Sequence, residues 1–206
     1  MLKLFTLLGF LAAVHSAAVP GAYHGEVVFV GSSTTAFWLN EGKSVWDQNY
    51  APLGGVNVGV PGDVTRQTID RIRGGSVDNF DARVVVLHIG QNDLAANTPI
   101  ETVSDNIGII LSLLKANLPR ARIILLAILP RGDAVIHQRI RNANQLIQRY
   151  DDGRTVRVIN MENAFSYGLG QVYTNLYRDD LLHYSTEGYR VWASNMKSLF
   201  DELYYS

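Results

Sequence analysis

Residues 27–35 read VVFVGSSTT, and this stretch decides the fold class. Four consecutive apolar residues of strand length lead into a Gly-Ser-Ser turn, after which the spacing becomes helical. A strand with apolar residues at every position is typical of a parallel sheet that is covered on both faces. The turn would place serine hydroxyls at the carboxyl edge of that sheet, where α/β enzymes gather their reactive groups.

The same alternation of strand-length apolar runs and longer helical segments continues along the chain and predicts βαβ units. The predicted strands are residues 26–31, 56–59, 83–90, 121–129 and 155–161. The predicted helices are residues 34–46, 64–72, 99–118, 134–150 and 186–203. We therefore expect an α/β fold, a three-layer α/β/α (flavodoxin-like) domain with a five-stranded parallel sheet.

Composition limits the class of protein. The 206 residues are 47% hydrophobic, which is enough to bury one substantial core in a single domain. A formal net charge of -1 gives no electrostatic reason to expect a nucleic-acid partner. The chain has no cysteine, so its stability must come from the core and not from disulfides.

The first residues form a pattern of their own. Lys3 precedes an apolar run over residues 4–14, which the small residues at 16–18 follow. This order is typical of a secretory signal peptide, and the run is too short to span a bilayer. An N-terminal helix packed on the domain is the alternative, but the run lacks the polar face of such a helix. We expect residues 1–18 to be a signal peptide cleaved near residue 16 or 18, residues 19–206 to form the domain, and the protein to be secreted without a transmembrane anchor.

Two adjacent serines, Ser32 and Ser33, follow the first strand. A serine that cleaves esters needs a base, an acid that orients the base, and donors for the developing oxyanion. Ser33 stands near the start of the predicted helix, where free N–H groups favour negative charge. Either serine could instead be an ordinary N-cap. No Gly-x-Ser-x-Gly elbow is present, because Thr35 occupies the last position, so the α/β-hydrolase fold is not indicated.

The candidates for the base are His15, His24, His88, His137 and His183. The first leaves with the predicted leader, and the second lies just beyond it. His88 lies inside an apolar strand and is expected to be structural, while His137 is expected to be exposed. His183 follows Asp180 by three positions, so one helical turn would bring the carboxylate to one ring nitrogen and leave the other free. A surface ion pair is the alternative interpretation.

Oxyanion donors could come from two places. The glycine turn Gly59-Val-Pro-Gly62 follows the second predicted strand, and Asn92 follows the third. Backbone N–H groups and a side-chain amide are both suited to the role. Each signal alone is weak, because glycines and asparagines often end strands. Together with the serines they share one edge of the predicted sheet, which favours a site there.

Five phrases resemble the blocks of the SGNH, or GDSL-like, hydrolase family. They read, in order, VVFVGSS, VNVGVPGDVTRQTIDRI, VVVLHIGQND, ARIILLAILPRG and DLLHYSTEGY. Within that family the chain is most similar to the platelet-activating-factor acetylhydrolase IB catalytic-subunit type. The likeness runs from residue 27 to the last predicted helix, and therefore covers a whole domain.

The resemblance implies a carboxylic ester hydrolase in which Ser33 is the nucleophile, His183 the base and Asp180 the acid that orients it. It also implies an oxyanion hole made by the backbone N–H groups of Ser33 and Gly62 and by the side-chain amide of Asn92. It implies no metal and no organic cofactor. A small ester would be the substrate, and a homodimer is the assembly that the resemblance suggests.

The chain departs from the family at Ser32, where an aspartate is usual. That acid supports the turn and accepts no proton, so we expect weaker positioning of the nucleophile and not the loss of the chemistry. The substitution also makes Ser32 a rival nucleophile, although Ser33 holds the family position. The missing acid motivates an alternative, a catalytically weak secreted ligand-binding protein on the same fold.

Neighbours of the reactive groups suggest an acyl pocket. Thr34 follows the nucleophile and Leu182 precedes the histidine, so both are expected to line an apolar wall. No lid-sized insertion interrupts the family blocks, and an open, shallow site suits acetyl and other short acyl esters. The alcohol could be phospholipid-like, a sugar or a small aliphatic alcohol, so a carbohydrate deacetylase stays open as an alternative.

Overall fold

The protein is described here by a computed structural model that covers residues 25–206. Its central sheet comprises the strands β1 (Val27–Gly31), β2 (Gly55–Asn57), β3 (Val84–His88), β4 (Arg122–Leu126) and β5 (Val156–Ile159). The spatial order is β2-β1-β3-β4-β5, and all neighbouring strands are parallel. The predicted α/β fold with a five-stranded parallel sheet is confirmed.

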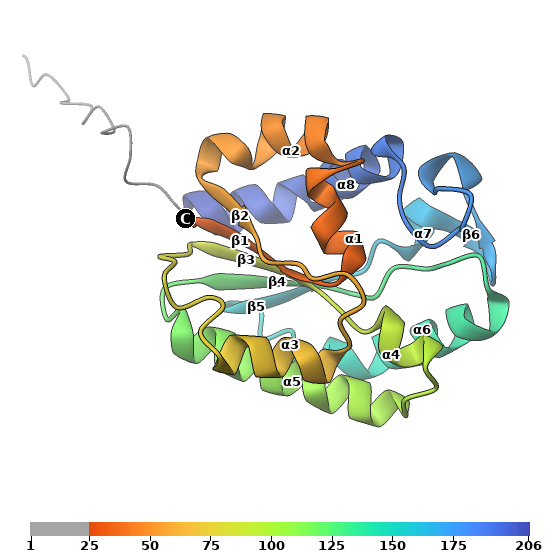
Figure 1. The fold of residues 1–206 in the computed structure, drawn as a ribbon, viewed down its shortest axis with the longest axis horizontal. Coiled ribbons are helices and arrows are strands. Elements are labelled where there is room, and N and C mark those ends of the chain that lie inside the picture. Colours follow the sequence, from red (N-terminus) through yellow and green to blue (C-terminus); the bar gives the residue numbers. More distant parts are fainter. Residues whose placement is uncertain (1–24) are drawn as a thin grey trace, which may run out of the picture.

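Helices cover both faces of the sheet (Figure 1). One face carries α2 (Lys43–Asn49) and α8 (Thr186–Tyr205), and the other carries α3 (Thr65–Arg73), α5 (Ile100–Asn117) and α6 (Ala134–Ile147). The short helices α1 (Ser33–Ala36), α4 (Gln91–Ala95) and α7 (Glu162–Phe165) come directly after β1, β3 and β5. These three helices therefore lie at the carboxyl edge, where a parallel sheet holds its site.

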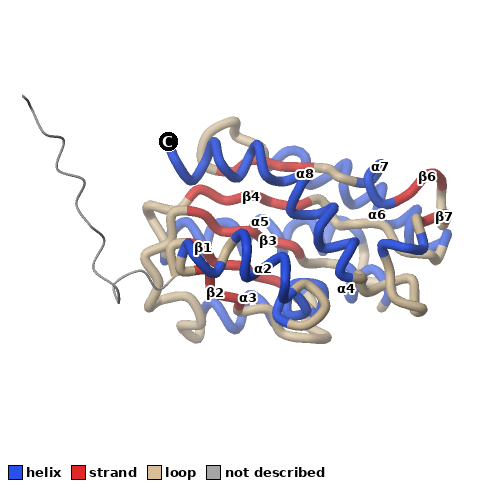
Figure 2. The backbone as a smooth tube through the Cα atoms, turned by 90° about the horizontal axis from the view of Figure 1, so that it is seen from above, coloured by secondary structure: helices blue, strands red, loops and turns tan. Residues whose placement is uncertain are grey.

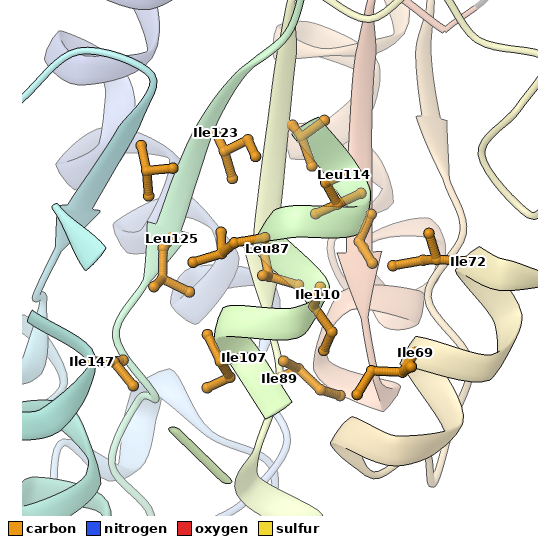
Figure 3. Packing of buried hydrophobic residues seen from close by; sticks show 14 of the residues in the cluster. Ile69, Ile72, Leu87, Ile89, Ile107, Ile110, Leu114, Ile123, Leu125 and Ile147 are labelled. Atoms are coloured by element: carbon orange, nitrogen blue, oxygen red, sulfur yellow. The ribbon is translucent and has the colours of Figure 1, made fainter. Parts of the chain in front are cut away.

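The strands are apolar throughout because both faces are buried. In β1, Val28 and Val30 belong to the apolar cluster under α3, α5 and α6, whereas Val27 and Phe29 belong to the cluster under α2 and α8. Figure 3 shows the first cluster, in which Ile107, Ile110 and Leu114 of α5 lie over Leu87 and Leu125 of the sheet. This packing fixes the positions of the strand ends from which the site is built.

Residues 34–46 do not form the single continuous helix that was predicted. They lie in α1, a 3₁₀ turn at Phe37–Leu39, and α2. The chain folds back tightly between the last two, so that a Cβ atom at Gly42 would lie 2.8 Å from the Cα atom of Trp38. Sequence analysis also missed α4, α7 and the antiparallel hairpin of β6 (Ser166–Gly168) and β7 (Gln171–Val172), which lies beyond the strand ends beside α7 (Figure 2).

The predicted signal peptide, residues 1–18, lies outside the described residues, as does His24. Its cleavage therefore stays a prediction. Among residues 25–206, no helix combines the length and the apolar character needed to cross a bilayer.

Candidate active site

Ser33, His183 and Asp180 come together at the carboxyl edge of the sheet. Ser33 is the first residue of α1, and the other two lie in the turn that precedes α8. The Ser33 Oγ atom is 2.9 Å from His183 Nε2, and His183 Nδ1 is 2.7 Å from Asp180 Oδ2. The three side chains thus form one hydrogen-bonded series in the order that serine acyl transfer requires.

The Asp180 carboxylate is held by three donors. Its Oδ1 atom accepts hydrogen bonds from the backbone N–H groups of Leu182 and His183, both at 2.9 Å, and its Oδ2 atom faces the imidazole. Burial acts to raise the pKa of Asp180, but the bonds from the His183 ring and from these N–H groups outweigh it and lower the pKa to about 2. The ionised carboxylate favours a proton on Nδ1 and leaves Nε2 free to accept from Ser33.

The turn that carries His183 has a strained residue at its centre. Leu181 has a φ of 50°, a left-handed conformation that a leucine rarely adopts. Its carbonyl accepts a 2.9 Å bond from the Gly132 N–H, and its N–H bonds the Arg178 carbonyl at 2.9 Å. Gly132 allows this approach, because a Cβ atom there would lie 2.7 Å from the Leu181 side chain. The surrounding contacts therefore hold the backbone in a conformation that it would not adopt alone.

Gly62 lies on the loop that follows β2. Its φ of 85° requires a residue without a β-carbon, and a Cβ atom built there would meet nothing within 4 Å. The loop is tied to the serine turn by a 3.0 Å bond from the Val60 N–H to the Gly31 carbonyl. Within residues 25–206, the N–H groups of Gly62 and Ser33 make no hydrogen bond. Neither of these N–H groups is therefore occupied by an acceptor in the described part of the chain.

Asn92 of α4 is joined to the same loop. Its Nδ2 atom donates a 2.9 Å bond to the Asp63 carbonyl, which uses one of the two amide hydrogens. The neighbouring Asp93 accepts bonds from the Thr65 N–H at 2.9 Å and from the Thr65 hydroxyl at 2.6 Å. Burial raises the pKa of Asp93. The second amide hydrogen of Asn92 is therefore held next to the glycine turn and remains free to donate.

Comparison with known proteins identifies the family. Residues 29–191 match the GDSL-like Lipase/Acylhydrolase family. The chain belongs to this family. The human platelet-activating factor acetylhydrolase IB subunit alpha2 is 31% identical over 181 residues, which covers 86% of this chain and 77% of the human protein.

Solved structures of acylhydrolases share the fold. A GDSL-like lipase from Bacteroides thetaiotaomicron superposes with a TM-score of 0.73 at 25% identity, over 85% of this chain and 87% of that one. An acetylxylan esterase from Geobacillus stearothermophilus superposes with a TM-score of 0.66 at 17% identity, over 88% and 94% of the two chains. As a member of the GDSL-like family, the protein is a carboxylic ester hydrolase.

Of Ser32, Ser33 and Thr34 in this GDSL-like hydrolase, only Ser33 makes a hydrogen bond to the imidazole of His183. Ser32 is 3% exposed and makes no capping bond to α1. Thr34 is 1% exposed, and its hydroxyl is 3.0 Å from His88 Nδ1. Its side chain is therefore not available to line an acyl pocket, contrary to the prediction. Leu182, next to His183 in the sequence, is half-buried, and its place in an acyl pocket stays a prediction.

His88 has the structural role expected from the sequence. The Leu129 N–H donates to its Nε2 atom at 3.3 Å, so Nδ1 carries the proton and donates to the Thr34 hydroxyl. Burial lowers the pKa of His88 to about 3, which keeps the ring neutral. The ring joins the serine turn to the segment that follows β4.

The buried His88 predicts a loss of stability in acid. Above its unfolded pKa of about 6.5 the ring is neutral in both states, but below it only the unfolded chain takes up a proton. Folding stability should therefore fall as the pH drops from about 6.5 toward 3, by about 2 kcal/mol at pH 5. Urea unfolding at several pH values measures this loss. His88→Gln can make both hydrogen bonds without titrating, and an equally steep pH dependence in that variant would contradict the assignment.

His137 is buried, not exposed as predicted. Its side chain on α6 has no exposed surface, with Nε2 3.1 Å from Glu162 Oε1, and its Nδ1 atom accepts a 2.9 Å bond from the Gly170 N–H. Burial lowers the pKa of His137. The ring joins α6 to α7 and to the β6–β7 hairpin. In the described part of the chain, no group of three or more histidine and acidic side chains is placed to hold a metal ion.

Sequence analysis missed the residues that hold the two segments of the candidate oxyanion donors. Asp63 is 3% exposed and accepts two bonds from Arg71, at 2.7 and 3.0 Å. Asp63 and Asp93 stand directly after Gly62 and Asn92, where an acid would ordinarily be an exposed loop residue. The sequence does show an acid directly after each candidate donor. It does not show which residues of other elements bind these acids.

Proposed function

We propose that this acylhydrolase cleaves esters of short carboxylic acids, acetyl esters foremost, by acyl transfer through Ser33. The observation that carries the proposal is the hydrogen-bonded series of Ser33, His183 and Asp180, with distances of 2.9 and 2.7 Å. Ser33 Oγ attacks the ester carbonyl while His183 Nε2 accepts its proton. Asp180 stabilises the imidazolium that forms, because its carboxylate stays ionised.

The negative charge on the former carbonyl oxygen needs donors that are already in position. The free N–H groups of Ser33 and Gly62 and the second amide hydrogen of Asn92 would supply them. The protonated His183 then gives its proton to the leaving alcohol, and the acyl group remains on Ser33. Water, deprotonated by the same imidazole, attacks this acyl-enzyme and releases the acid, which restores the serine.

The short acyl length is supported by the surroundings of His183. The centroid of the Phe37 ring is 5.0 Å from that of the imidazole, and Leu182 is half-buried, so these two side chains can provide apolar contact for a short acyl group. The names of two relatives, an acetylhydrolase and an acetylxylan esterase, agree with an acetyl group.

Hydrolysis of a series of 4-nitrophenyl esters tests the proposal. We expect kcat/KM to reach its maximum at the acetate or the butyrate and to gain nothing for the octanoate, since each surplus methylene would stay in water and add no binding energy. An active-site phosphonate should abolish the turnover. Hydrolysis no faster than that by Ser33→Ala would contradict the proposal and favour the alternative of a ligand-binding protein.

Export completes the proposal. It rests on the positive, apolar and small residues at the start of the sequence, in the order of a signal peptide. N-terminal sequencing of protein recovered from the culture medium should begin near residue 17 or 19. Retention of the unprocessed chain inside the cell would contradict this part of the proposal.

A further inference from the structure

The segment that follows β4 crosses the candidate active site from the asparagine side to the histidine side. Gln91, the neighbour of Asn92, donates a 2.8 Å bond to the Leu129 carbonyl. The Pro130 carbonyl accepts a 2.8 Å bond from the Tyr177 hydroxyl. Two residues on, the Gly132 N–H bonds the carbonyl of Leu181, as described above. Arg131 is therefore fixed by its backbone on both sides, next to the turn that carries His183.

The guanidinium of Arg131 lacks the partners that such a group usually has. Within residues 25–206 it makes no ion pair and no hydrogen bond, and no aromatic ring lies under it. Its Nε atom is buried without a partner. Arg178, on the same turn as His183, offers the contrast, because it pairs with Glu41 at 2.9 Å and lies 5.8 Å from the Phe37 ring. A guanidinium without a protein partner at this edge has its remaining N–H groups free to bind an anion.

The backbone of Arg131 lies on the histidine side of the site. Tyr184 is next to His183 in sequence and fully buried. Burial raises the pKa of its hydroxyl, and the positive charge of Arg131 opposes that rise. The leaving alcohol must also lie on this side, because His183 Nε2 is the group that gives it a proton. The bond between the Gly132 N–H and the Leu181 carbonyl holds the backbone of Arg131 next to the turn that carries His183, and thus on the alcohol side of the site.

We infer that Arg131 binds a negatively charged group on the alcohol portion of the ester and so selects anionic alcohols. A guanidinium matches the oxygens of a carboxylate, phosphate or sulfate with two parallel N–H donors. The inference rests on the proposed function and adds to it the class of alcohol. Because the charge is fixed before binding, its effect falls on substrate selection and not on the acyl transfer itself.

The test compares two acetyl esters that differ in one charge, 4-acetoxybenzoate and its methyl ester. The measured quantity is the kcat/KM for 4-acetoxybenzoate divided by that for the methyl ester. This ratio cancels any general loss of activity or folding. We expect Arg131→Gln to lower this ratio by about tenfold or more, and Arg131→Lys to lower it less. Added NaCl should lower the wild-type ratio and leave that of Arg131→Gln nearly constant. Arg154→Gln, which removes the same charge just before β5 at the opposite edge of the sheet, is the matched control and should keep the wild-type ratio.

The outcomes separate this inference from the proposed function. If the wild-type enzyme hydrolyses the methyl ester but its ratio equals that of Arg131→Gln, selection by Arg131 is contradicted and the esterase proposal stands. A drop of equal size in Arg154→Gln would also contradict it, since the effect would then come from net charge. If neither ester is hydrolysed faster than by Ser33→Ala, the proposed function itself fails.

Discussion

Ser33→Ala is expected to lower kcat for 4-nitrophenyl acetate by about four to six orders of magnitude. The substitution removes the oxygen that bonds the acyl group and that lies 2.9 Å from His183 Nε2, while it leaves the packing of α1 nearly unchanged. Ser32→Ala is the matched control, because Ser32 is buried and makes no capping bond. The kcat of this variant should stay within about tenfold of the wild-type value, because a weaker turn costs little activity. Steady-state rates, with circular dichroism of each variant, give the measurement.

The reverse pattern would overturn the assignment of the nucleophile. If Ser32→Ala loses the activity and Ser33→Ala keeps it, the hydroxyl at the family position is not the one that reacts. If both variants keep the wild-type rate, hydrolysis does not pass through this turn at all.

Asp180→Asn should lower kcat by about 10⁴-fold. The Oδ1 atom of the asparagine can still accept from the N–H groups of Leu182 and His183, so the turn should keep its conformation. Its amide nitrogen would face His183 Nδ1 as a donor, which forces the ring proton onto Nε2. The ring could then no longer accept the proton of Ser33.

Asp179→Asn provides the control for that variant, since Asp179 is the exposed acid immediately before Asp180. It should keep the wild-type rate. A loss of less than about tenfold in Asp180→Asn, with the fold intact, would show that the carboxylate does not set the tautomer of His183. Stopped assays at matched enzyme concentration resolve a difference of this size.

Much of the fold could be predicted because the sheet is buried on both faces. Residues 27–30 and 84–87 are apolar at every position, a pattern typical of a covered parallel strand. The short elements were missed for a physical reason. Helix α4 has only five residues, too few for periodicity to show. It is held by the bond of Asn92 to the loop after β2 and by that of Asp93 to the first residue of α3.

In the candidate site, too, some residues could be predicted from the sequence and others could not. Ser33 and the pair of Asp180 and His183 could be proposed from local spacing and from the family blocks, since their chemistry depends on residue type. Thr34 and His137 could not be placed, because their burial depends on His88 and Glu162, 54 and 25 residues away along the chain. Arg131 could not be singled out from the sequence either, because only the structure shows that its side chain has no partner within residues 25–206.

Peptide mapping after reaction with a fluorophosphonate ester tests the central claim most directly. The reagent forms a stable adduct with a serine only where a base activates it and donors stabilise the phosphoryl oxygen. We predict one adduct per chain, on Ser33, and its loss in His183→Ala while Asp179→Asn still reacts. An adduct on Ser32, or no adduct in a folded wild-type protein that hydrolyses 4-nitrophenyl acetate, would contradict the account.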